Sequence, residues 1–315
     1  MHFLITGGAG FLGVHLANRL IVDGHHVRVI DDLSSGDRNH LSSAVHFHRG
    51  DVNNIPFMWS MLQDVDCVYH LAARVSVAQS MLYPRDYNDT NVGGTVSVME
   101  AMRDAGVRRV VFASSGAIYG ALSEQPVNEE MIPNPDSPYA VSKWSAEQYV
   151  HTIGHLWGIE TVALRIFNAY GPRQSLPVSH APVVPRFLRQ ALSGGSLVLF
   201  GNGNQTRDFI YVSDVVAALL RAAQAKQVNR KVINVGSGCE TSIARLAALV
   251  EEVTGHSTNR ISSTSRPGGV QRLVADISRA RRLLGWEPQT TLADGLARTV
   301  AEDQRFRSHE LTLPG

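Results

Sequence analysis

The sequence predicts an α/β fold in which a doubly wound parallel sheet is joined to a smaller mixed α/β domain. Short apolar runs alternate with segments of helical periodicity through the first half of the chain, as βαβ units require. A glycine-rich turn, Gly7–Gly13, lies between the first apolar run and the first helical segment. The alternation ends at Pro172, where Pro177, Pro182 and Pro185 follow and interrupt the chain. The second domain is therefore expected beyond this break.

Each expected strand of the sheet is a short, mostly apolar run bounded by turn residues. In chain order the runs are His2–Thr6, His26–Ile30, Val45–His48, Cys67–Leu71, Val110–Ala113, Thr161–Arg165 and Val232–Val235. Apolar residues at helical spacing fill the intervals between and beyond them. The expected helices are Phe11–Asp23, Ile55–Leu62, Tyr87–Asp104, Pro138–Trp157, Val212–Ala223 and Thr241–Thr254. Residues 309–315 carry no such pattern, and we expect a frayed tail there.

Composition narrows the class of protein. A chain of 315 residues exceeds what one core comfortably fills, and 44% apolar against 18% charged residues excludes disorder. With 29 Lys and Arg against 28 Asp and Glu, the formal charge is +1, which argues against nucleic acid or an anionic membrane as partner. Cys67 and Cys239 are too few for a disulfide framework. No stretch resembles a spanning helix or a signal peptide, so we expect a cytoplasmic protein.

The glycine-rich turn predicts a dinucleotide site. Gly7, Gly10 and Gly13 would let the backbone turn tightly, approach a pyrophosphate and pack the helix on the sheet. The helix N-terminus would then present N–H groups to the phosphates. Asp31 and Asp32 follow the second strand, where a carboxylate can accept hydrogen bonds from the adenine ribose. Because a carboxylate there repels a 2′-phosphate, the pattern favours a Rossmann-type fold that binds NAD rather than NADP.

Several spaced motifs resemble one family, the extended short-chain dehydrogenases/reductases that include sugar-nucleotide epimerases and dehydratases. The glycine spacing, Gly50-Asp51-Val52, His70-Leu71-Ala72-Ala73 and Asn91 occur in the family's order, and the resemblance covers roughly residues 1–300. It implies the following cofactor-binding residues: Gly7, Gly10, Phe11, Leu12, Asp31, Asp32, Ser35, Gly36, Asp51, Val52, Leu71, Ala72, Ala73, Asn91, Tyr139, Lys143 and Phe167.

The segment Tyr139-Ala140-Val141-Ser142-Lys143 provides candidate catalytic residues. Its Tyr and Lys lie four residues apart on a predicted helix, and therefore on one face. A phenol with a pKa of about 10 is a poor base near neutrality. We expect the Lys143 ammonium, together with the positive nicotinamide ring, to lower the pKa of Tyr139. Lys143 would also hold the nicotinamide ribose.

A serine completes the expected catalytic group. Ser115 lies at the end of a predicted strand, where the family keeps a catalytic Ser or Thr, and would relay the substrate proton to Tyr139. Relatives that eliminate water carry an Asp-Glu pair where this chain has Gly116-Ala117, and decarboxylating relatives keep a Glu at the second position. The resemblance therefore implies neither elimination nor decarboxylation, and leaves oxidation and re-reduction at one carbon.

The resemblance also implies a substrate site. Asn168 would donate to a substrate phosphate, Val184 lies at the helix start beneath the nucleotide base, and Arg207 and Arg266 match diphosphate ligands, with Ser115 nearest the sugar. Guanidinium groups suit this role because their planar fork pairs bidentately with phosphate oxygens. Gly269 replaces an Asp found in many relatives, which leaves the identity of the base open.

These expectations combine into one leading hypothesis and two alternatives. The first is an NAD-dependent 4-epimerase of a nucleotide sugar, a UDP-hexose or UDP-hexuronate, that acts as a homodimer through the helices near 87–104 and 138–157. The second is a dehydratase or decarboxylase of the same family, and the third is a non-catalytic dinucleotide-binding sensor. The 13 histidines show no tight ligand spacing, so we expect no metal. The expected NAD-binding domain spans 1–173 plus about 207–238, and the nucleotide-sugar domain spans 174–206 and 239–308.

Overall fold

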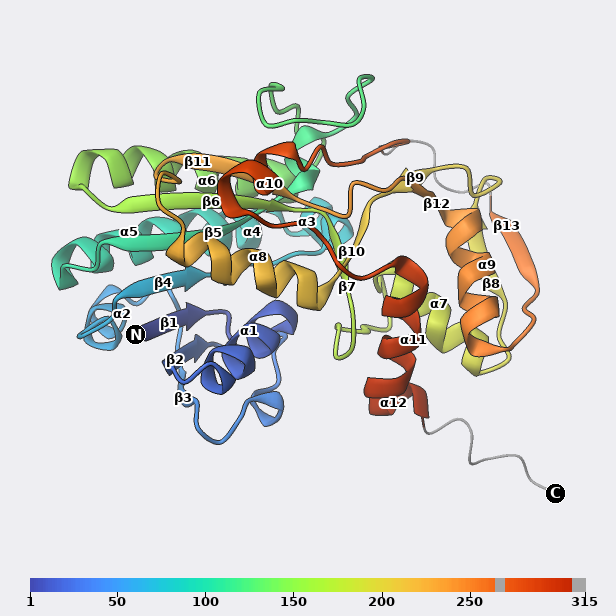
Figure 1. Ribbon diagram of the computed structural model, residues 1–315, viewed down its shortest axis with the longest axis horizontal. Coiled ribbons are helices and arrows are strands. Elements are labelled where there is room, and N and C mark those ends of the chain that lie inside the picture. The colour runs from blue at the N-terminus through green and yellow to red at the C-terminus, as the bar shows by residue number, and fades with distance from the viewer. Residues whose placement is uncertain (264–269, 308–315) are drawn as a thin grey trace.

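Seven parallel strands form the central sheet of the protein (Figure 1). The structure is a computed structural model that describes residues 1–263 and 270–307. Across the sheet the strands are β11 (Lys231–Val235), β6 (Glu160–Ile166), β5 (Arg109–Ser115), β4 (Cys67–His70), β1 (His2–Thr6), β2 (His26–Asp31) and β3 (His46–Arg49). Each expected strand is present, which confirms the Rossmann-type sheet. The strand order reverses direction between β4 and β1, and ligands of such sheets bind at this switch point.

Both faces of the sheet are covered by helices because its strands are apolar on both sides. In β1, Phe3 and Ile5 pack into one hydrophobic cluster, and Leu4 packs into another on the opposite face. The helices of the first face are α1 (Phe11–Val22), α8 (Val212–Gln224) and α10 (Ser278–Leu284). Those of the second face are α2 (Ile55–Met61), α5 (Gly94–Ala105) and α6 (Pro138–Trp157). The predicted double winding is therefore confirmed.

The helix expected over 87–104 has a different form. A short helix α4 (Pro84–Tyr87) leads into a π-helical turn labelled η2 (Asn88–Gly93), and α5 comes directly after it. A further helix, α3 (Val77–Leu82), was not expected, and 3-10 turns occur at η1 (Arg38–His40) and η3 (Gly116–Tyr119). A π turn inserts an extra residue and rotates the next turn of the helix about its axis, so a helical periodicity cannot mark it.

A third hydrophobic cluster lies beside the sheet, to its right in Figure 1, and is built from residues 170–306. Its helices are α7 (Val183–Leu192), α9 (Ile243–Thr254), α11 (Leu292–Glu302) and α12 (Gln304–Arg307). Three two-stranded sheets accompany them: β7 (Asn168–Tyr170) with β10 (Phe209–Tyr211), β8 (Leu197–Phe200) with β13 (Arg260–Ser263), and β9 (Thr206–Arg207) with β12 (Thr241–Ser242). We propose that this part of the chain forms the second domain, with the expected boundaries 174–206 and 239–308.

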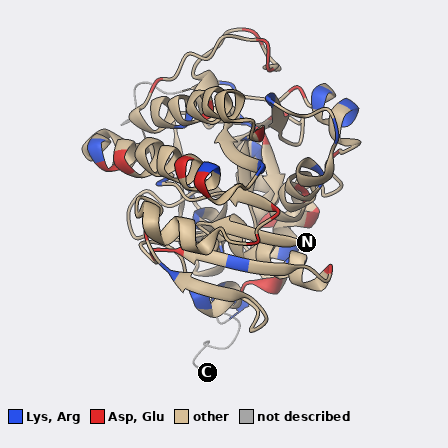
Figure 2. Ribbon diagram, turned by 90° about the vertical axis from the view of Figure 1, so that its left-hand side faces the viewer, with Lys and Arg blue, Asp and Glu red and all other residues tan. Residues whose placement is uncertain are grey.

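Residues of both charge signs are interspersed along the ribbon, as Figure 2 shows from one side. Within the described part of the chain, no helix is both long and apolar enough to cross a membrane. In the same residues no three His, Cys, Asp or Glu side chains are grouped so as to hold a metal ion. The expected tail, 309–315, lies outside the described residues.

Candidate active site

A cavity of about 430 Å³ opens at the carboxyl ends of the central strands. It extends from the Asp51 segment past the glycine-rich turn to Tyr139 and Lys143 on α6. The expected cofactor residues that line it are Gly7, Gly10, Phe11, Leu12, Asp31, Asp32, Ser35, Asp51, Val52, Leu71, Ala72, Ala73, Tyr139, Lys143 and Phe167. An elongated cavity at the topological switch point has the shape and position that a dinucleotide requires.

The turn before α1 requires glycine for steric reasons. Gly7 has φ of +68°, and a Cβ there would lie 2.7 Å from the backbone of Ala72 at the end of β4. A Cβ on Gly13 would lie 2.4 Å from the carbonyl oxygen of Gly7. Gly10 precedes α1 and provides no side-chain cap for its first turn. Because these residues have no side chains, a ligand in the cavity can approach the backbone of the turn closely. These residues therefore fit the pyrophosphate of a dinucleotide.

The two aspartates after β2 have separate roles. Asp31 is buried, and its Oδ2 and Oδ1 accept hydrogen bonds from Ala9 N at 3.0 Å and Leu33 N at 2.8 Å. Burial raises the pKa of this carboxyl, and the backbone hydrogen bonds oppose the shift. Asp32 is exposed, and its Oδ1 accepts from the backbone and the hydroxyl of Ser34. Asp31 thus shapes the turn, Asp32 is the more exposed of the two carboxylates, and both line the cavity.

Two expected cofactor residues do not line the cavity. Asn91 is buried; its Oδ1 accepts from Arg74 N, and its Nδ2 donates to Arg74 O and Ser142 Oγ. It therefore ties the loop after β4 to α6. Gly36 packs against Ala9, where a Cβ would meet backbone atoms at 2.8 Å. Both positions support the walls of the cavity from outside.

A second cavity of about 830 Å³ adjoins the first. Of the expected substrate residues, Ser115, Asn168 and Arg207 line it. Burial lowers the pKa of Arg207, and the charge of Asp136, which also lines this cavity, opposes that shift. The residues that line both cavities are Val75, Ser115, Tyr139, Ile166 and Phe167. The two cavities therefore adjoin at these residues, Ser115 and Tyr139 among them.

Tyr139 and Lys143 lie one turn apart on α6, which begins after Ser137 caps the N–H of Ala140. Burial raises the pKa of the Tyr139 phenol, and its hydrogen bond with Ser115 partly opposes that shift. Lys143 is 3% exposed, and burial lowers its pKa to about 7. The expected lowering of the Tyr139 pKa is thus absent from the protein alone, because desolvation of the phenol outweighs its hydrogen bond with Ser115.

Two positions of this chain, Gly116 and Ala117, correspond to the acidic pair of the relatives that eliminate water, and neither is an acid. Gly116 and Ala117 line the second cavity, and a Cβ on Gly116 would lie 3.0 Å from the Phe167 ring. Among the described residues that line this cavity, Asp136 supplies the carboxylate. Sequence reasoning missed it, because an Asp just before a capped helix looks like an ordinary helix-start residue.

Two further residues were expected to bind the substrate, Val184 and Arg266. Val184 is buried in the cluster of α7 and lines neither cavity. Arg266 lies outside the described residues. Gln174 and Ser175, from the segment 174–185 that was expected to set selectivity for the sugar, line the first cavity. Lining residues that were not expected include Arg74 and Thr90 in the first cavity and Val77, Met81 and Gln271 in the second. Most lie in loops or on α3, where no periodic signal marks them.

Known proteins resemble this chain over nearly its whole length. A profile of the NAD dependent epimerase/dehydratase family matches residues 3–236. A UDP-glucose 4-epimerase of Mycolicibacterium smegmatis is 39% identical over 307 residues, which are 95% of this chain and 97% of that protein. These matches agree with the resemblance that the spaced motifs predicted.

Solved structures with the same fold extend the comparison. UDP-glucose 4-epimerase of Thermotoga maritima with UDP-glucose superposes with a TM-score of 0.93 at 36% identity, covering 99% of this chain and 100% of that one. UDP-glucuronic acid 4-epimerase of Bacillus cereus, in complex with UDP-glucuronic acid and NAD, has a TM-score of 0.88 at 33% identity, covering 96% and 98%. The fold is therefore shared along nearly the whole chain.

Proposed function

The chain belongs to the NAD dependent epimerase/dehydratase family, and from this premise we propose that it is an isomerase that inverts C4 of a UDP-hexose or UDP-hexuronate. It resembles UDP-glucose 4-epimerases over nearly its whole length. One observation carries the proposal: the dinucleotide cavity and the second cavity adjoin at Ser115 and Tyr139. A sugar carbon held there would lie beside both a proton acceptor and the cofactor.

The side chains of the site have different roles in this reaction. Tyr139 takes the proton of the C4 hydroxyl, directly or through the hydroxyl of Ser115. NAD, held by the glycine-rich turn and Lys143 in the first cavity, would supply a hydride acceptor for C4 and then a hydride donor toward the opposite face of the sugar. Lys143 holds the ribose of the cofactor and supplies positive charge beside Tyr139. Arg207 and Asn168 bind the diphosphate, which anchors the nucleotide while the 4-keto sugar turns over in the larger cavity.

Tyr139→Phe tests the assignment of the base. We expect the rate of epimerisation to fall about 10²–10⁴-fold or more, because general-base catalysis and the proton relay are both removed. The NAD content and the melting temperature should stay near the wild-type values. The measurement is the rate of C4 inversion by NMR over a panel of UDP-sugars. If the variant keeps most of its activity, Tyr139 is not the base.

The same panel separates the alternatives. A dehydratase would exchange the C5 hydrogen with solvent, and a decarboxylase would release carbon dioxide from a UDP-hexuronate. With Ala117 where such enzymes keep an acid, we expect neither. Deuterium from solvent at C5 of the product would contradict the epimerase. Bound NAD without turnover of any UDP-sugar would favour the sensor.

Four further assignments belong to the same proposal. The partner of the protein is a nucleotide sugar rather than nucleic acid or a membrane, in keeping with a formal charge of +1. The enzyme works in the cytoplasm as a homodimer. Exposed apolar side chains on α3 and α6, among them Leu82 and Leu156, support pairing through these helices. We infer NAD rather than NADP from the carboxylates of Asp31 and Asp32.

A further inference from the structure

A buried ion pair links α6 to the sheet behind the proposed catalytic residues. Glu147 is fully buried and the Arg165 side chain is 4% exposed. Arg165 Nη2 donates to Glu147 Oε1 at 2.7 Å, and Arg165 Nε donates to Oε2 at 3.1 Å. Taking both charges out of water is costly, so such a pair is weak evidence for stability and calls for another reason.

The carboxylate of Glu147 also holds the strand that carries Ser115. Ser114 Oγ donates to Glu147 Oε2 at 2.6 Å. Successive side chains of a strand point to opposite sides, so the bond made by Ser114 fixes where Ser115 points. The Ser115 hydroxyl then accepts from Ala117 N at 3.2 Å, at the start of the turn η3.

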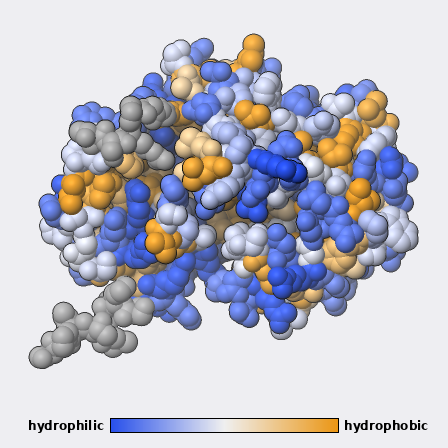
Figure 3. Space-filling model, turned by 180° about the vertical axis from the view of Figure 1, so that it is seen from behind, coloured by the Kyte–Doolittle hydropathy of each residue, from blue (hydrophilic) through white to orange (hydrophobic). Residues whose placement is uncertain are grey.

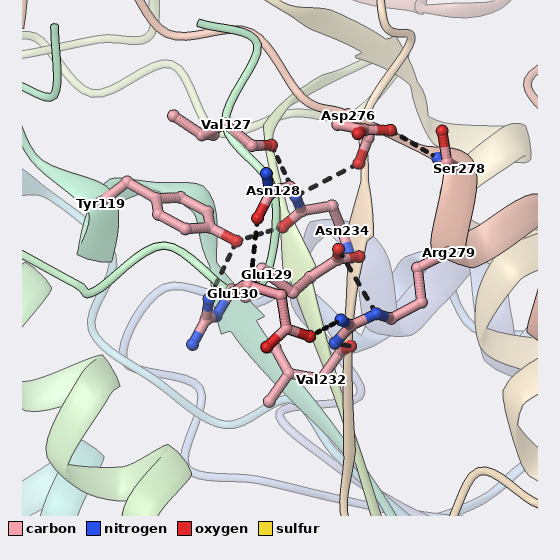
Figure 4. Close-up of polar contacts among 11 residues, drawn as sticks. Tyr119, Val127, Asn128, Glu129, Glu130, Val232, Asn234, Asp276, Ser278 and Arg279 are labelled. Carbon is pink, nitrogen blue, oxygen red and sulfur yellow. Dashed lines mark hydrogen bonds and ion pairs between the residues drawn. The ribbon is translucent and has the colours of Figure 1, made fainter. Parts of the chain in front are cut away.

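Arg165 holds the C-terminal end of the segment 114–119, whose N-terminal end is held through Ser114. Its Nη1 donates to the hydroxyl of Tyr119 at 2.8 Å, and this hydroxyl donates to Asn234 Oδ1 at 2.7 Å. Asn234 is fixed in turn, because its Nδ2 donates to the carbonyl oxygens of Val127 and Asp276 (Figure 4). Residues 114–119 are therefore tied at both ends to one ion pair.

Helix α6 carries Tyr139, Lys143 and Glu147 at four-residue spacing, and therefore along one side of the helix. Tyr139 and Lys143 line the first cavity, whereas Glu147 is in neither cavity lining. Glu147 thus connects the helix that bears the base to the strand that bears the serine. A shift of that connection would change the hydrogen bond between Ser115 and Tyr139.

We propose that Glu147 is a positioning residue of the epimerase, which through Ser114 and through Arg165 with Tyr119 sets the Ser115 hydroxyl against Tyr139. The proposal rests on the proposed function. A displacement of about 1 Å in such an arrangement costs on the order of 10²-fold in rate. An ion pair that served stability alone would leave the turnover of the folded enzyme unchanged.

Two variants test this without leaving a buried charge unpaired. Ser114→Ala removes the link to the strand and leaves the Glu147–Arg165 pair intact. Tyr119→Phe removes the link to the turn, and Tyr119 lines neither cavity. Glu160→Gln is the control, since Glu160 pairs with Arg109 at the opposite ends of the same strands, β5 and β6. The holoenzyme is assayed at saturating NAD and well below each melting temperature.

We expect kcat to fall about ten- to a hundredfold in both variants, with KM and NAD affinity within about twofold of wild type. The control should keep wild-type kcat. If either variant keeps more than half of the wild-type kcat, or if its loss follows a loss of NAD affinity, the positioning role is wrong. A wild-type enzyme that turns over no UDP-sugar would instead refute the proposed function, so the two failures are distinguishable.

Discussion

At the scale of single residues, Lys143 shows how burial sets the chemistry of the site. Its Nζ lies 4.4 Å from the centroid of the Phe112 ring, beneath the proposed cofactor cavity. Burial lowers the pKa of this lysine to about 7, and the carboxylate of Glu147 opposes the shift. The four-residue spacing from Tyr139 was visible in the sequence, whereas the burial came from packing between α6 and the strands and was not.

The lysine should make the stability of the cofactor-free protein depend on pH. Between about pH 7 and the usual lysine pKa of 10.5, the unfolded chain holds a proton that the folded protein has released. The free energy of unfolding therefore rises with pH in this window, by at most about 1.4 kcal/mol per pH unit. Lys143→Met lacks this contribution. Urea unfolding of both proteins at pH 7 and about pH 9.5 measures it, and parallel pH dependences would contradict the buried lysine.

Arg207 gives a second prediction at this scale. Arg207→Ala should weaken binding of UDP by about 1.5–3 kcal/mol, because a hydrogen bond to a charged group has this value. The effect on kcat should be smaller, since the diphosphate is bound equally in the ground and transition states. Calorimetric titration with UDP measures it. Arg245→Ala is the control, because Arg245 forms an exposed pair with Glu252 on α9. Equal UDP affinities in all three proteins would remove Arg207 from the site.

At the scale of elements, the turn between β1 and α1 connects backbone geometry to the cofactor site. Gly7 and Gly24 both have positive φ, at +68° and +81°. A Cβ on Gly7 would meet the backbone of Ala72 at 2.7 Å, whereas nothing lies within 4 Å of one on Gly24. A side chain at Gly24 would therefore strain only the backbone, whereas a side chain at Gly7 would in addition clash with the neighbouring strand.

We expect Gly24→Ala to cost about 1–2 kcal/mol, which is the strain of the left-handed conformation alone. Gly7→Ala should cost about 1–3 kcal/mol more, because the ends of β1 and β4 must move apart. It should also weaken NAD binding, since both ends line the cavity. Chemical denaturation and NAD titration of the two variants make the comparison. Equal losses of stability would show that the close approach to Ala72 is relaxed at no cost.

The elements differ in how far the sequence predicts them. Most strands of the central sheet are apolar runs between helices, because burial on both faces leaves that pattern, and all seven strands were predicted. The exception is the edge strand β3, His46–Arg49, in which no residue is fully buried. Strands β7, β9 and β10 have two or three residues each and form by pairing with distant segments, so they carry too few positions for a period. Helix α3 was missed because Val77, Met81 and Leu82 are exposed rather than packed in a core.

The candidate site was predictable to the same extent. Motif residues at the ends of β1, β2, β4 and β5 line the cavities, because the carboxyl ends of parallel strands share one edge of the sheet. Val184 does not line a cavity, since its position in α7 is set by the third hydrophobic cluster. Asp136 and Gln271 approach the second cavity from separate loops, and only tertiary packing decides that.

At the scale of the whole molecule, apolar side chains that remain exposed suggest where a second copy binds. Seen from behind, hydrophobic residues form small groups among hydrophilic ones (Figure 3). Large exposed apolar side chains recur on two helices that pack together, α3 and α6. They are Val77, Met81 and Leu82 on α3 and Val141, Tyr149 and Leu156 on α6. Val77 and Met81 also line the second cavity, so Leu82 and the residues of α6 are the ones free to form an interface. The described residues of α5, which was expected to share the interface, contribute none of these large exposed side chains.

This distribution predicts a symmetric dimer through α3 and α6, because an exposed apolar surface can be buried against its own copy across a two-fold axis. Light scattering should give about twice the chain mass of 34.3 kDa. Leu156→Glu, whose side chain is 69% exposed, should give the mass of one chain, because a buried carboxylate would face its own copy at the interface. Val22→Glu is the control: Val22 is 81% exposed on α1, on the other face of the sheet, and this variant should stay dimeric. A monomeric wild-type protein, or a dimeric Leu156→Glu variant, would place the exposed apolar residues of α6 outside any interface.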